Sequence, residues 1–95
     1  MYTLRRSAEF EEQAESIEPD VKRFDEVIRG IEYAIAKAPY QFPCVLIGET
    51  EIRVAKTRAF PGVPPFRVFF ALGPQPTDPI SLLWIEELEG PEETL

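Results

Sequence analysis

The stretch VKRFDEVIRGIEYAIAKA, residues 21–38, decides the fold class of this chain. Its apolar residues recur at spacings of three and four, which places them on one stripe of an α-helix. The members of the stripe are Val21, Phe24, Ile28, Ile31, Ile35 and Ala38. We expect this helix to begin at Pro19, because proline is tolerated at the first helical position. It should stop at Ala38, because the residue before a proline avoids the helical region.

A shorter helix is expected upstream, over residues 8–16. Ser7 suits the N-cap position, and the glutamates that follow it suit the positive end of the helix dipole. The apolar face of this helix would consist of Phe10, Ala14 and Ile17. A tight turn then joins the two helices, which predicts an antiparallel helix hairpin. Before the first helix, residues 2–6 alternate as a short strand would.

After Pro43 the pattern changes from helix to strand. The strand-like runs are residues 45–47, 52–55, 66–72 and 80–85. Six of the ten prolines lie between positions 61 and 79, where they separate the last strands. Helices followed by strands imply an α+β fold. We therefore predict a single domain over residues 1–89, with the N-terminal short strand and the helix hairpin packed on a three- to four-stranded antiparallel sheet, and an acidic C-terminal tail over 90–95.

Composition excludes several function classes. The 95 residues carry a net charge of −7, which disfavours nonspecific nucleic-acid binding because such proteins need a positive field. No run of about 18 apolar residues is present, so no membrane span is expected. The chain has no histidine, which removes the commonest general base and metal ligand, and we expect no metal or other cofactor. With Cys44 as the single cysteine and no signal-peptide core, a reduced cytoplasmic location is expected.

The charge is unevenly distributed along the chain. Residues 49–67 carry four basic and two acidic residues, whereas residues 68–95 carry six acidic residues and no basic one. The four basic residues are Arg53, Lys56, Arg58 and Arg67. One interpretation is a site for a phosphate or an acidic partner segment, because guanidinium groups bind oxygen pairs well. The other interpretation is a solvated sheet face on which some arginines pair with Glu86 or Glu87.

Three short motifs carry a family resemblance. They are Glu51-Ile52-Arg53-Val54, Pro65-Phe66-Arg67-Val68-Phe69-Phe70 and Ile80-Ser81-Leu82-Leu83. In this order, after a helix hairpin, the chain resembles the RelE/ParE superfamily of toxins from bacterial type II toxin–antitoxin systems. The resemblance covers roughly residues 3–88. It implies a bacterial or phage protein whose partner is a cognate antitoxin that wraps the sheet and the helix hairpin.

The chain also departs from the family pattern. Trp84 stands where the messenger-RNA-cleaving members have a histidine, and Glu86 and Glu87 stand where basic residues follow. RNA cleavage needs a proton acceptor, a proton donor and cationic stabilisation, and only the last is evident. The resemblance therefore favours growth inhibition by protein binding, as in ParE-like toxins whose known target is DNA gyrase. No catalytic residue is assigned.

Two alternatives remain open from the sequence. The first is a ribosome-dependent messenger RNA endonuclease with an atypical set of residues around Lys56, Arg58 and Arg67. The second is a degenerate homologue without toxicity that has a structural or regulatory role.

Two single residues are expected to have structural roles only. Trp84 is expected in the core or packed on a sheet face, and Cys44 is expected to be buried and inert.

Overall fold

The computed structural model describes residues 2–17, 21–48, 50–58, 65–75 and 77–88. The predicted helix start at Pro19 and the predicted tail at 90–95 lie outside these ranges. The elements, in chain order, are β1 (Leu4–Arg6), α1 (Ala8–Ile17), α2 (Val21–Lys37), the 3-10 helix η1 (Pro39–Gln41), β2 (Cys44–Ile47), β3 (Thr50–Lys56), β4 (Phe66–Ala71) and β5 (Ile80–Glu87). Among these helices, none is long and apolar enough to cross a membrane.

The strands form one five-stranded mixed sheet in the order β1-β5-β4-β3-β2. Strands β2 to β5 pair antiparallel, as the hairpin connections predict, and β1 pairs parallel with β5. The α+β class is therefore confirmed, with four antiparallel strands as expected. The sheet differs from the prediction in one respect: the short strand β1 joins it as a fifth, parallel strand, so the sheet is mixed. The first strand joins the sheet through pairs such as Leu4 with Ile80, which are far apart in the sequence.

Ser7 determines where α1 begins. Its Oγ accepts a hydrogen bond from the backbone N–H of Phe10 at 3.0 Å, which is the predicted N-cap contact. The same hydroxyl donates to the carbonyl oxygen of Leu83 at 3.1 Å. One side chain therefore caps the helix and fixes its first turn against β5.

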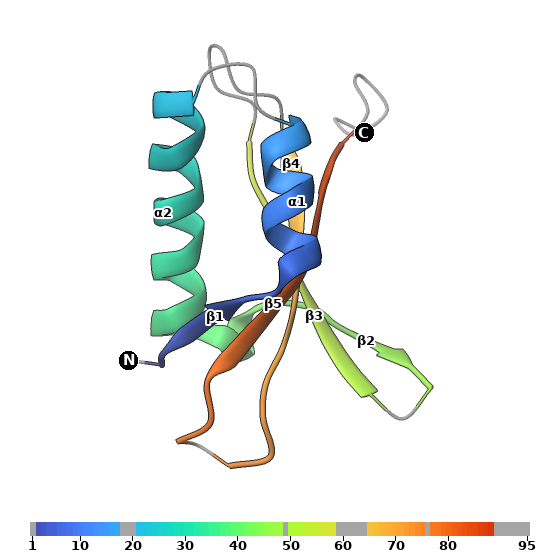
Figure 1. The fold of residues 1–95 in the computed structure, drawn as a ribbon. Coiled ribbons are helices and arrows are strands. Elements are labelled where there is room, and N and C mark those ends of the chain that lie inside the picture. The colour runs from blue at the N-terminus through green and yellow to red at the C-terminus, as the bar shows by residue number, and fades with distance from the viewer. Residues whose placement is uncertain (1, 18–20, 49, 59–64, 76, 89–95) are drawn as a thin grey trace.

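The two helices run antiparallel and cover one face of the sheet (Figure 1). The predicted stripe of α2 points into the core, where Phe24, Ile28 and Ile35 are buried. They meet the inward side chains of the sheet, and the rings of Phe24 and Phe66 lie 5.4 Å apart. Phe10 of α1 is also fully buried. The helix hairpin therefore packs on the sheet as its periodicity predicts.

One prediction about a single residue is wrong, and another is narrowed. Cys44 is exposed rather than buried, because β2 is one of the two edge strands and lies away from both helices (Figure 1). Of the two positions expected for Trp84, the structure shows the sheet face and not the core, since 44% of its surface is exposed. It lies on the face of the sheet that the helices leave uncovered.

Candidate functional site

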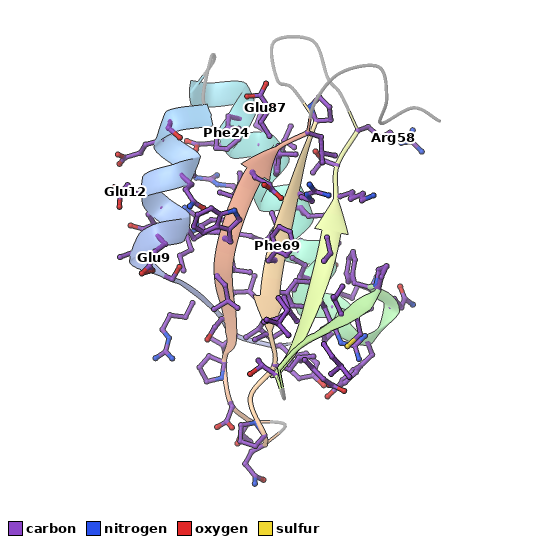
Figure 2. All side chains as sticks on the ribbon, turned by 90° about the vertical axis from the view of Figure 1, so that its right-hand side faces the viewer. Glu9, Glu12, Phe24, Arg58, Phe69 and Glu87 are labelled. Carbon is purple, nitrogen blue, oxygen red and sulfur yellow. The ribbon has the colours of Figure 1, made fainter. Side chains whose placement is uncertain are left out.

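The open face of the sheet, defined as the face opposite the helices, carries most of the candidate side chains. Side chains alternate between the two faces of a strand. In β4 this alternation buries Phe66, Val68 and Phe70 and turns Arg67 and Phe69 to the open face. Figure 2 shows Phe69 near the middle of this face, with α2 behind the sheet.

A polar row crosses the open face over three strands. Lys56 of β3 lies opposite Arg67 of β4, which lies opposite Glu86 of β5. The Nε atom of Arg67 donates a hydrogen bond to Oε1 of Glu86 at 2.7 Å. Within the described residues Lys56 makes no ion pair, and it is exposed. Two cations directly opposite each other repel, so the row favours an approaching anion beside Lys56.

An apolar hollow of about 240 Å³ lies directly beside the polar row. It is lined by Ile47, Ile52, Phe69, Leu83, Trp84 and Glu86. A β-bulge shapes it, because the register shifts so that Phe69 opposes Trp84 and Phe70 opposes Leu82. Leu83 is the extra residue on β5, and a bulge of this kind redirects the neighbouring side chains. Leu83 and Trp84 therefore both line the hollow although they are consecutive in the chain.

Arg53 lies on the other side of the sheet from this row. It pairs with Phe70, a core residue, and its Nη1 donates to the carbonyl oxygen of Phe42 at 2.7 Å. Its guanidinium carbon lies 5.2 Å from the centre of the Tyr40 ring. Arg53 therefore holds the segment after α2 against β3, and the structure does not bring it together with Lys56 and Arg67.

Arg58 is separate from both groups. It follows the end of β3 and lines a groove of about 480 Å³ together with Thr57 and residues of α2. The α2 residues of the groove are Glu26, Val27, Gly30 and Ile31. Figure 2 shows Arg58 beyond the end of the strand, away from Phe69. The four basic residues that the sequence singles out thus occupy three places.

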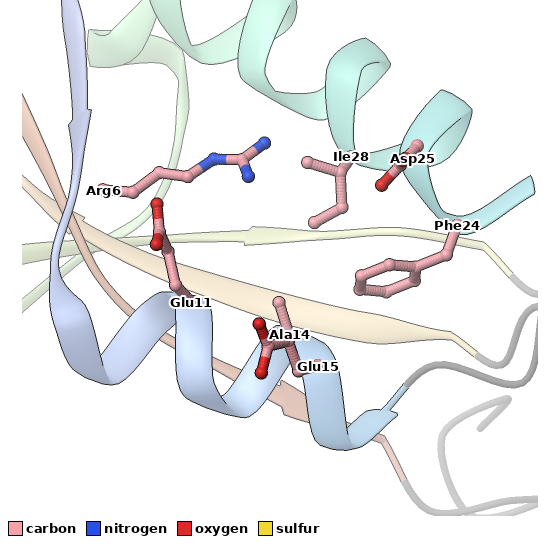
Figure 3. Close-up of a pocket in the computed structure, with 7 residues that line it drawn as sticks. All are labelled: Arg6, Glu11, Ala14, Glu15, Phe24, Asp25 and Ile28. Atoms are coloured by element: carbon pink, nitrogen blue, oxygen red, sulfur yellow. The ribbon is translucent and has the colours of Figure 1, made fainter. Parts of the chain in front are cut away.

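A second hollow, of about 220 Å³, opens between the two helices and was not predicted from the sequence. Phe24, Ala14 and Ile28 form apolar parts of its wall, and carboxylates stand around them (Figure 3). Arg6 reaches into this hollow from β1, and its Nε and Nη2 donate to the two carboxylate oxygens of Glu32 at 2.8 and 3.0 Å. This pairing with Glu32 raises the pKa of the Arg6 guanidinium above its ordinary value. The ion pair of Arg6 with Glu32 therefore ties β1 to α2.

The open face combines cations with an exposed aromatic surface, and that combination suits recognition of an apolar and acidic ligand. The described residues contain no group of three or more His, Cys, Asp or Glu side chains that could hold a metal ion. Compared with known proteins, the chain matches no family model, no curated protein and no solved structure. The resemblance to the RelE/ParE superfamily therefore stays a prediction from the sequence.

Proposed function

We propose that this chain is a RelE/ParE-like toxin that inhibits growth by binding a protein through the open face, and that a cognate antitoxin neutralises it. The observation that carries the proposal is the apolar hollow around Trp84, which lies beside Lys56 and Arg67. Exposed aromatic side chains next to arginine are typical of protein interfaces, where they supply most of the binding energy. A cytoplasmic location and DNA gyrase as a possible target belong to the same proposal.

The charges of the open face favour a partner segment that is both acidic and apolar. An acidic side chain of the partner would approach Lys56, while an apolar side chain of the same segment would enter the hollow between Phe69 and Trp84. The partner's carboxylate would compete with Glu86 for Arg67, because Arg67 already donates to Glu86. Such complementary charge mainly sets the association rate and the specificity.

The endonuclease alternative is favoured by a different observation, the juxtaposition of Lys56 and Arg67. Two adjacent cations could stabilise the charge that develops on a phosphate during cleavage. A proton acceptor would have to be Glu86, whose Oε1 already accepts a hydrogen bond from Arg67. This competition favours the binding function over cleavage.

Growth inhibition by matched variants tests the proposal. Trp84→Asp should abolish growth inhibition after induction in bacterial cells, because it places a charge in the hollow. Tyr33→Asp is the control, since Tyr33 is an exposed aromatic residue on helix α2, on the other side of the sheet, with 55% of its surface exposed against 44% for Trp84. Both variants should keep the circular dichroism of the wild type. Inhibition that persists in Trp84→Asp, or no inhibition by the wild type, would contradict the proposal.

A further inference from the structure

The outer edge of β2 has no partner strand in the described structure and carries none of the usual protection. All four residues of Cys44–Ile47 are apolar and exposed, with exposed fractions of 49% for Val45, 68% for Leu46 and 63% for Ile47. Natural sheets protect such edges with lysine, proline, bulges or a covering segment. No charge, proline or bulge interrupts β2 between Cys44 and Ile47, and among the described residues no segment pairs with its outer edge.

The backbone pattern shows which groups the edge offers. The N–H of Val54 donates to the carbonyl oxygen of Pro43 at 3.1 Å, so Pro43 and Val54 form a hydrogen-bonded pair. Hydrogen-bonded and non-hydrogen-bonded pairs alternate along an antiparallel ladder. The register pairs Cys44 with Arg53 and Leu46 with Glu51, and both are therefore non-hydrogen-bonded pairs. The N–H and C=O groups of Cys44 and Leu46 consequently point away from β3, toward the free edge.

We propose that β2 pairs antiparallel with β2 of a second copy of this chain, with Val45 on the two-fold axis. In this register Cys44 of one copy lies opposite Leu46 of the other, and all four outward backbone groups of each copy are satisfied. A shift by two residues would place Leu46 opposite itself and leave Cys44 opposite Gly48, beyond the end of the strand. In this one register, the outward N–H and C=O groups of one β2 edge match those of an identical edge, as a two-fold interface requires.

The charge distribution permits this contact although each chain carries a net charge of −7. No charged residue lies within Cys44–Ile47. The neighbouring strand β3 places Arg53 beside Cys44 and Glu51 beside Leu46. In the proposed register, a row of side chains therefore runs from Arg53 and Cys44 of one copy to Leu46 and Glu51 of the other. The two charged ends of this row have opposite signs. This pairing would join the two sheets into one, and its evidence, the free edge of β2, is separate from that for the proposed function, although Ile47 also lines the hollow.

The first experiment measures molar mass by light scattering over two orders of magnitude in protein concentration. The wild type should change from the mass of one chain to that of two. Val45→Lys and Val45→Glu should each remain monomeric, because like charges meet on the axis, and an equimolar mixture of the two should recover the dimer. Tyr33→Lys is the control, since it makes the same kind of change away from the edge. A wild type that stays monomeric, or a mixture that does not recover the dimer, would overturn the proposal.

The second experiment tests the register by disulfide formation, in a Cys44→Ser background. A non-hydrogen-bonded pair has its Cα atoms about 4.5 Å apart, which is within the range that a disulfide spans. Val45→Cys should therefore give a covalent dimer on oxidation. Ile47→Cys should not, because the two Ile47 positions lie on opposite sides of the axis. Equal cross-linking by both variants, or none by Val45→Cys, would show that this register is wrong.

Discussion

Arg67 and Glu86 face each other across β4 and β5, with the Nε atom of Arg67 2.7 Å from Oε1 of Glu86. This pair neutralises one of the two cations that the sheet register places side by side. Lys56, opposite Arg67 on β3, is then an exposed cation on the same face as the apolar hollow, and it makes no ion pair within the described residues. The candidate site is therefore a cation, an ion pair and an aromatic hollow on one face of the sheet.

The Arg67–Glu86 pair should contribute little to the stability of the fold. Both side chains remain more than a third accessible, and such pairs are worth at most about 1 kcal/mol because water screens them. A double-mutant cycle with Arg67→Ala and Glu86→Ala, followed by urea unfolding, should give a coupling energy in that range. A coupling several times larger would mean that the pair is a structural element rather than part of a binding surface.

Ile28→Asp should unfold the domain. Ile28 is 2% exposed in the centre of the α2 stripe, and the substitution buries an unpaired carboxylate in place of a branched aliphatic side chain. The expected cost of about 3–5 kcal/mol is a large part of the stability of a small domain. Thermal unfolding followed by circular dichroism measures it, with Tyr33→Asp on the exposed side of the same helix as the control. A folded Ile28→Asp variant with an unchanged melting temperature would place the core on another face.

Ser7→Ala should destabilise the protein by about 1–2 kcal/mol, because it removes a helix cap and a hydrogen bond to β5. The matched variant is Ser16→Ala, since the hydroxyl of Ser16 donates to the carbonyl of Gln13 in the same helix and to no strand of the described sheet. Chemical unfolding of the two variants should therefore give clearly different midpoints. Equal midpoints would indicate that Ser7 does not anchor α1 to the sheet.

Two glycines should respond to alanine in opposite directions. Gly48 has a φ of 65° in the turn between β2 and β3, and alanine there should cost about 1 kcal/mol because its Cβ disfavours positive φ. Gly30 lies within α2 with no atom within 4 Å of an added Cβ, and alanine there should stabilise the helix by about 0.5–1 kcal/mol. Unfolding midpoints of the two single variants measure both effects. A shift in the same direction for both would contradict the backbone geometry of one of the two sites.

The helices and the class of the fold were predictable because their signals are local. The stripe of α2 and the Ser7 cap each lie within one element, where spacing alone defines the face or the end. The parallel pairing of β1 with β5 was not predictable, because it joins segments that are more than 70 residues apart and depends on the packing of the helices between them. The exposure of Cys44 depends on the same long-range order, since it places β2 at the edge.

The candidate site was predictable only in part. Arg53 and Lys56 are three residues apart in one strand, so the alternation of side chains alone separates them onto opposite faces. The sequence therefore already indicated that the two side chains lie on opposite faces, and the prediction of one site containing both overlooked this. The adjacency of Lys56, Arg67 and Glu86 depends on the register between three strands, which no local pattern specifies. The bulge that turns both Leu83 and Trp84 to the hollow depends on that register as well.

The most direct test of the proposed binding function is to map the ends of cellular messenger RNA after the chain is induced alone. Binding to a protein target predicts slower growth with the same message ends as in uninduced cells. An Arg67→Ala variant, measured in parallel, should give the same unchanged ends. New codon-specific ends that appear with the wild type and disappear with Arg67→Ala would contradict the binding function and establish the endonuclease instead.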